Sequence, residues 1–251
     1  MSPHSRRAPG PGVSERPTQG QAAFSQVSGG APCQTAPVRD RVNRLDTAFP
    51  MAASIALELI RRPEVSYRWA RPSALPKMSV GALACHLGRQ ALRAAELLPM
   101  TTDVSPLDSV DEHFERSSWV TSGPPEDPSD DPGPDETEAA LGPSALAARA
   151  DGALETVRSL LAEGTARDVV PIPWQDWSLR RNDFLLTRLL EIVVHADDLA
   201  VSVGVPTPEF PEEVFAPVRD LLVRLAVRRH GQSAVISTLA RSERARTISA
   251  L

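Results

Sequence analysis

Glu191, His195 and His86 are the residues whose types and spacing point most directly to chemistry. Glu191 and His195 are four residues apart in RLLEIVVHADDLAVSVG (residues 188–204), a segment with helical periodicity, so their side chains share one helix face. His86 lies far upstream in a second helical pattern, SVGALACHLGRQ. Two histidines and one carboxylate are a known zinc ligand set that leaves a fourth position open. The sequence therefore predicts a divalent-metal site held by two helices.

A simpler interpretation of the same stripe is a solvated face. Glu191 and His195 share it with Thr187, Arg188 and Asp198, and such mixed-charge stripes commonly carry weak ion pairs in water. The rest of the segment is apolar around most of the helix, however, which is typical of a buried helix. A polar stripe on a buried helix needs partners, and a metal would supply them.

Polar neighbours of the stripe have their own expected roles. Asp198 shares the ligand face, and we expect it to orient a ligand or Arg188, or to be solvated, whereas Asp197 should point away. Arg188 would contact an anionic substrate or pair with Glu191 or Asp198. The paired aspartates do not by themselves define an acid–base site.

The other histidines and the cysteines are weaker candidates for a functional role. His113 lies near an acidic segment, and His230 precedes Gly231 at a helix end, where it would interact with the helix C-terminus. Cys85 lies within a helical pattern and should be a small core residue. With only two cysteines, the sequence has no disulfide framework and no Cys-based zinc site.

Composition favours an all-α protein with one medium domain. The chain has 251 residues, 41% of them hydrophobic and only 4% aromatic, and the apolar content is mainly Ala, Leu and Val. The net charge of −5 gives no global sign of nucleic-acid binding. No stretch approaches the length of a membrane span, and no apolar run follows the first arginines, so we expect a cytoplasmic protein.

Helical periodicity predicts the elements that must position these residues. Ser79 should cap the helix that carries His86, Asn182 or Asp183 should cap the helix that carries Glu191 and His195, and Gly204 should close the latter. Trp174 and Trp177 lie in an expected extended connector and should pack over the end of the bundle. The principal helices are expected over about 40–62, 79–99, 136–163 and 183–204, followed by a fifth over 212–229 and a short sixth.

These elements give a domain organisation. Residues 1–38 are rich in Pro, Gly, Ser and Gln and should be a disordered tail. Residues 39–204 should form a four-helix bundle whose core can carry a metal, interrupted by a flexible acidic loop at 122–135. Residues 205–251 should form a C-terminal helical extension.

The two motifs around His86 and Glu191 resemble the metal-binding domain of mycothiol-dependent maleylpyruvate isomerases, in the DinB-like superfamily of four-helix bundles. The resemblance covers about residues 40–204, and the C-terminus resembles that of uncharacterised actinobacterial members. It implies that His86, Glu191 and His195 bind a divalent metal, typically Zn²⁺. Characterised isomerases carry a sterol-carrier-like α/β domain behind the bundle, whereas residues 205–251 here are predicted to be helical. We expect the substrate-binding groups of that domain to be missing.

The resemblance also implies a function. The expected activity is transfer or isomerisation on a small electrophile with mycothiol, a low-molecular-weight thiol, as co-substrate, in an isomerase or S-transferase. One alternative is a non-catalytic, metal-stabilised helical module that binds a partner through its basic C-terminal helices. Another is a metal-free bundle with a solvated stripe. An open coordination position that solvent can reach would favour the enzyme.

Overall fold

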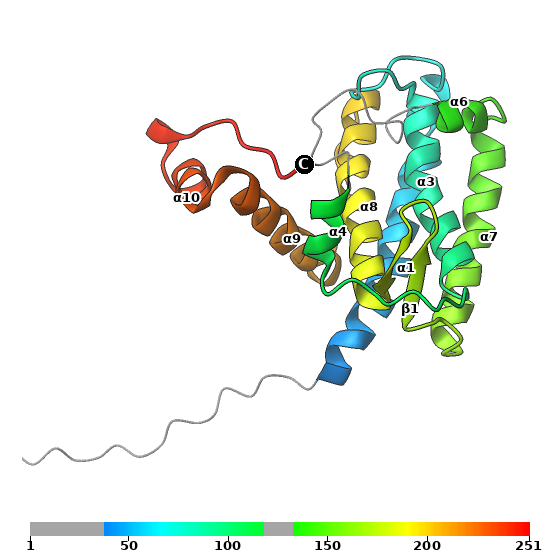
Figure 1. Cartoon of the computed structure of the whole chain (residues 1–251). Coiled ribbons are helices and arrows are strands. Elements are labelled where there is room, and N and C mark those ends of the chain that lie inside the picture. Colours follow the sequence, from blue (N-terminus) through cyan, green and yellow to red (C-terminus); the bar gives the residue numbers. More distant parts are fainter. Residues whose placement is uncertain (1–37, 118–132) are drawn as a thin grey trace, which may run out of the picture. The chain divides into compact units, whose positions relative to one another are not determined.

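The long predicted helices form a DinB-like four-helix bundle made of α1 (Val38–Ile60), α3 (Val80–Leu97), α7 (Pro143–Ala162) and α8 (Arg181–Val203) (Figure 1). The computed structural model describes residues 38–117 and 133–251. Helix α3 contacts both α7 and α8, and α1 contacts the same two helices. The all-α fold predicted from composition and periodicity is confirmed.

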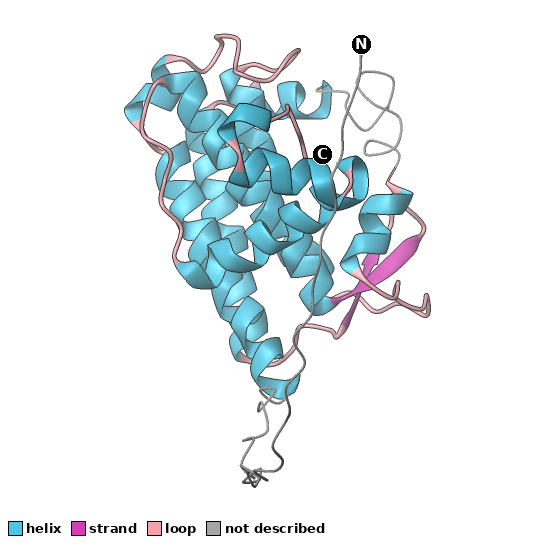
Figure 2. Cartoon of the chain, turned by 90° about the vertical axis from the view of Figure 1, so that its left-hand side faces the viewer, coloured by secondary structure: helices cyan, strands magenta, loops and turns pink. Residues whose placement is uncertain are grey.

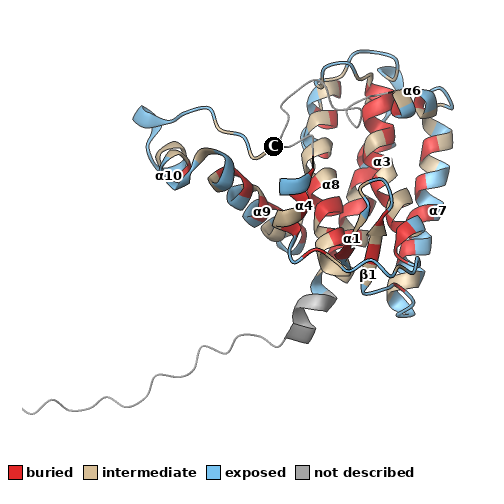
Figure 3. Cartoon of the chain, in the orientation of Figure 1, coloured by how far each residue is buried: buried red, intermediate tan, exposed pale blue. Residues whose placement is uncertain are grey.

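Helix α3 is the most buried of the bundle helices because it has neighbours on several sides (Figure 3). Leu83 and Leu87 of α3 pack in one core with Phe184, Leu185 and Leu189 of α8, and all five side chains are buried. The polar residues of α3 that lie outside this core form one narrow stripe. His86 belongs to that stripe, so packing of the apolar faces determines where it points.

Two of the predicted helix ends are confirmed. The hydroxyl of Ser79 caps α3 by accepting a hydrogen bond from the backbone N–H of Ala82 at 3.0 Å. Gly204 ends α8 in the left-handed conformation, with φ of 68°. The predicted cap at Asn182 or Asp183 is wrong, because α8 begins at Arg181 and both residues are already helical.

The single helix expected over 136–163 is two helices. Gly142, with φ of 85°, separates α6 (Gly133–Ala139) from α7. Residues 133–135, expected in the flexible acidic loop, form the first turn of α6 instead. Glu136 fastens α6 to α3, since its carboxylate accepts hydrogen bonds from the backbone N–H and the hydroxyl of Ser79. The rest of that loop (122–132) lies outside the described residues, and so does the expected N-terminal tail (1–38) except Val38, which begins α1.

The connector before α8 is a β-hairpin of β1 (Val169–Ile172) and β2 (Trp177–Arg180), with Val170 opposite Leu179 (Figure 2). Two short helices, α2 (Pro63–Tyr67) and α4 (Val110–Arg116), lie in the other connections. The sequence predicted an extended connector there but not its pairing, which depends on contacts between strands.

Beyond Gly204, residues 205–211 are not helical, and the expected C-terminal helices follow them. Helix α9 (Glu212–His230) contacts α1 and α8, with Val214, Val218 and Leu221 buried. It is followed by α10 (Gln232–Ala240) and the 3₁₀ turn η2 (Ser242–Arg244). No helix in residues 38–117 or 133–251 has the length and apolar content that a membrane span requires.

Candidate metal centre

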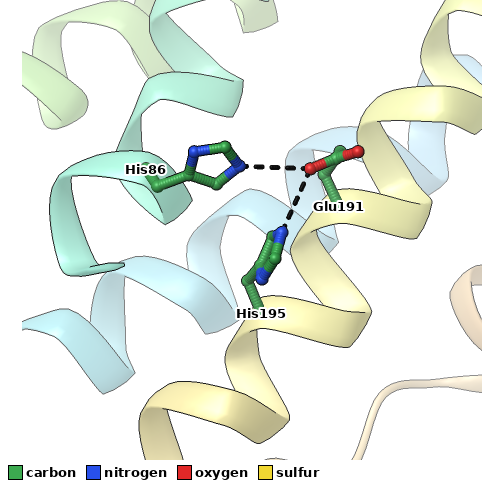
Figure 4. A group of neighbouring side chains, drawn as sticks. All are labelled: His86, Glu191 and His195. Carbon is green, nitrogen blue, oxygen red and sulfur yellow. Dashed lines mark hydrogen bonds and ion pairs between the residues drawn. The ribbon is translucent and has the colours of Figure 1, made fainter. Parts of the chain in front are cut away.

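His86, Glu191 and His195 meet between α3 and α8, and one ligand atom from each lies within 4.8 Å of the other two (Figure 4). Nε2 of His86 and Nε2 of His195 both lie 3.2 Å from the same carboxylate oxygen, Oε2 of Glu191. The two imidazole rings are nearly perpendicular, with centroids 4.7 Å apart. The predicted three residues therefore do point at a common centre.

The second nitrogen of each imidazole is held by a carboxylate. Nδ1 of His86 lies 3.2 Å from Oδ2 of Asp135, and Nδ1 of His195 lies 3.0 Å from Oδ2 of Asp198. A histidine that donates Nδ1–H to a carboxylate has its Nε2 lone pair directed at the centre, which is the usual arrangement around metal-binding histidines. Asp198 thus contacts His195, which is the contact that its expected orienting role requires. Asp197 turns away and accepts a hydrogen bond from Thr207.

Opposite charges compensate for burial at this centre. Burial alone would raise the pKa of Glu191, but hydrogen bonds from His195 and His86 and the charges of His195 and Arg188 hold it well below its usual range. Burial would lower the pKa of His195, yet its hydrogen bonds with Asp198 and Glu191 raise that pKa to about 9. In the metal-free protein, Glu191 is therefore ionised and His195 is protonated near neutral pH.

The centre remains reachable from solvent. The side chains of His86, Glu191 and His195 keep 30%, 17% and 20% of their surface exposed. A structural site closed on all sides would bury its ligands more completely. The partial exposure is compatible with the open position that a catalytic site needs.

Asp135 and Arg89 complete the support for His86 and were missed by the sequence reasoning. Asp135 is only 5% exposed and also forms an ion pair with Arg89, which in turn pairs with Glu138 of α6 at 3.2 Å. The signal available was weak: Arg89 follows His86 by three residues and shares its face. Asp135 lies in an acidic, Pro-rich segment that resembles a loop, and only the docking of α6 brings it to the centre.

A second set of contacts fixes the distance between the two ligand-bearing helices. Arg188 donates from Nη1 to Oε1 of Gln90 at 2.8 Å, and Gln90 donates to the backbone carbonyl of His86 at 2.9 Å. Of the alternatives expected for Arg188, an ion pair within 4 Å of Glu191 or Asp198 is not found among the described residues. Its partners are neutral oxygens.

The remaining candidates lie away from the centre. Cys85 is fully buried, and burial raises the pKa of its thiol to about 12, as expected for a core residue. His230 contacts the backbone of Ser249 rather than the end of its own helix. The basic residues Arg224 and Arg228 of α9 form ion pairs with Asp111 of α4.

Taken with the bundle, this constellation defines a class of protein: four-helix bundles whose facing helices present an inward set of histidine and carboxylate side chains. Residues 52–200, more than half of the chain, match the family described as the mycothiol maleylpyruvate isomerase N-terminal domain. The chain belongs to that family, which confirms the resemblance carried by the two motifs. Searches of the curated proteins and of the solved structures found no match.

Proposed function

We propose that this protein binds a divalent metal, with Zn²⁺ the best fit, through Nε2 of His86, the carboxylate of Glu191 and Nε2 of His195. The observation that carries the proposal is the pairing of each Nδ1 with a carboxylate, which directs both Nε2 atoms to one carboxylate oxygen. Two imidazoles and one carboxylate match the donor types that zinc takes in catalytic sites. The residues present therefore fit the metal.

The family membership supports mycothiol as the small-molecule partner and thiol-dependent transfer or isomerisation of a small electrophile as the reaction. A divalent metal in such a site lowers the pKa of a bound thiol or water and orients it. The chain's own contribution is to hold the donors still: Asp135 and Asp198 fix the two rings, and Gln90 and Arg188 tie α3 to α8.

The test is metal content followed by thiol binding. Protein purified without chelator should contain about one zinc ion per chain. His195→Ala should lower the bound metal strongly, whereas His230→Ala, a histidine substitution remote from the centre, should not.

Calorimetry should then show that the zinc-loaded protein binds mycothiol more tightly than its S-methyl derivative, because alkylation removes the ionisable sulfur. Removal of the metal should abolish the difference. Equal affinity for the two compounds, in folded and metal-loaded protein, would exclude thiol activation and leave the non-catalytic metal-stabilised module as the better account.

A further inference from the structure

Arg93 and Arg188 lie beside the centre on the two helices that carry its ligands. Arg93 follows His86 by seven residues on α3, and Arg188 precedes Glu191 by three on α8, so each shares a face with the ligand on its own helix. The pairs His86–Glu191 and Gln90–Arg188 show that α3 and α8 run antiparallel. Both arginines therefore lie toward the same end of the bundle, seen from the centre.

Arg188 is a buried cation that forms no direct ion pair with a carboxylate in the described part of the chain, although Glu191 lies within reach of its charge. Arg188 is only 8% exposed, and its hydrogen bonds go to Oε1 of Gln90 at 2.8 Å and Oγ1 of Thr187 at 3.2 Å, both neutral acceptors. Burial lowers its pKa, and the charge of Glu191 offsets this only in part. A buried guanidinium normally has an anionic partner, because desolvation of the charge is otherwise costly.

Arg93, like Arg188, forms no ion pair with a carboxylate among residues 44–117 and 133–251. Its guanidinium stacks over the ring of Trp174, 4.0 Å from the ring centroid. Burial, together with the charges of Arg188 and Arg89, lowers the pKa of Arg93 to about 10. A guanidinium stacked by its face keeps its N–H edges available, and these are the groups that bind carboxylate or phosphate in bidentate fashion.

Two other partly buried arginines do have carboxylate partners. Arg89 pairs with Asp135 and Glu138, and Arg181 pairs with Asp46. Arg93 lies within reach of the charge of Arg188, which disfavours its own protonated form. Neither guanidinium forms an ion pair with a carboxylate of the described residues, although the charges of Glu191 and Asp135 also act on Arg93.

His113 adds a neutral donor near Arg188. Its Nδ1 accepts a hydrogen bond from Nε1 of Trp177 at 3.2 Å. Burial and then the charge of Arg188 lower the pKa of His113 to about 4, so the ring is neutral at pH 7 and carries its proton on Nε2. His113 is thus a neutral neighbour of Arg188 and not an anionic partner for it.

We propose that Arg93 and Arg188 form an anion subsite beside the His86–Glu191–His195 centre and bind the carboxylate or phosphate group of a small ligand. Two guanidinium groups on facing helices provide the bidentate donors that such an oxyanion takes. The ligand's uncharged part then extends toward the three predicted metal ligands. That placement rests on the proposed function, whereas anion binding itself does not require the metal.

The experiment uses the metal-free full-length protein, so that no probe can bind through a metal. The probes are succinate, inorganic phosphate and the neutral succinamide, titrated at millimolar concentration. Binding is followed in ¹H–¹⁵N spectra by the side-chain Nε–Hε signals of the arginines. We expect saturable shifts of the Arg93 and Arg188 signals with succinate or phosphate and none with succinamide. The better of the two anions identifies the ligand group.

Variants separate the subsite from general charge effects. Arg93→Gln should weaken anion binding by about tenfold or more. Arg93→Lys, which keeps the charge but not the planar donor pair, should restore it only in part. Arg219→Gln removes the same charge from an exposed arginine of α9 paired with Glu212 and Asp220, and should change nothing. Because Arg93 is a partly exposed residue outside the main core, its variants test the subsite even if Arg188→Gln fails to fold.

Two outcomes keep this proposal distinct from the proposed function. Zinc binding without any saturable anion shift, or equal anion affinity in Arg93→Gln and the unaltered protein, would overturn the subsite and leave the metal centre standing. Anion binding that depends on Arg93 in a protein that takes no zinc would support the subsite and overturn the metal centre.

Discussion

Oδ2 of Asp198 lies 3.0 Å from Nδ1 of His195, one turn further along α8, and this contact directs Nε2 of the ring toward Glu191. Asp135 does the same for His86 from a different helix, α6. The centre thus has one support within its own helix and one supplied by tertiary contact. The contact from Asp198 and the contact from Asp135 can therefore be removed one at a time by mutation.

Asp198→Asn and Asp135→Asn should each lower zinc affinity about 10- to 100-fold, because the imidazole loses the carboxylate that fixes its tautomer and orientation. Competition with a chromogenic chelator measures the affinity. Asp197→Asn is the matched control, since Asp197 is adjacent on α8 but bonds Thr207 instead. Similar losses in all three variants would argue against a specific role for the two supporting carboxylates.

Metal uptake should release a proton from His195. Its pKa in the metal-free protein is raised to about 9, so near neutral pH the ring must lose a proton before Nε2 can bind a metal. Apparent zinc affinity should therefore rise with pH, by about tenfold per pH unit between about pH 6.5 and 8. Calorimetry in buffers of different ionisation enthalpy counts the released protons. A pH-independent affinity would contradict the protonated state of His195.

His113 should make the fold sensitive to mild acid. Its folded-state pKa, about 4, lies below the value of 6.5 expected when the chain is unfolded. The unfolded chain therefore takes up this proton first, and stability is lost as the pH falls from about 6.5 to about 4, by about 3 kcal/mol in all. Above pH 6.5 this group has no effect. Urea unfolding measures the loss.

The matched variant for that measurement is His113→Gln, which keeps a polar side chain near Trp177 without a titratable ring. Its free energy of unfolding should fall less steeply than that of the unaltered protein across the same pH window. Parallel curves would show that His113 is not the titrating group.

Gly81 and Gly152 offer a paired test of packing. A Cβ at Gly81 would lie 2.7 Å from ring atoms of Trp69, whose indole N–H donates to the carbonyl of Ala139, so Gly81→Ala should destabilise the protein by about 1–3 kcal/mol. A Cβ at Gly152 in α7 meets nothing within 4 Å, and Gly152→Ala should stabilise it by up to about 1 kcal/mol. Thermal unfolding measures both. Equal changes in stability for the two variants would show that Trp69 does not restrict the size of the side chain at position 81.

Periodicity and local chemistry in the sequence determined much of this protein. The spacing of apolar residues predicted α1, α3 and α8 to within a few residues, because burial of one face depends on the helical repeat, but it merged α6 and α7 into one helix. The caps at Ser79 and Gly204 follow from hydrogen bonding and backbone freedom that are local to each residue. The four-residue spacing placed Glu191 and His195 on one face before any fold was known.

Only the tertiary structure decided which distant groups meet that face. The docking of α6 on α3 brings Asp135 to His86. The acidic sequence around Asp135 has no apolar pattern that would predict its burial. The hairpin and α4 place Trp174 over Arg93 and Trp177 against His113. The reason is physical: a helix repeat reports which side of its own segment is apolar, whereas the partner of a polar side chain depends on how separate segments pack.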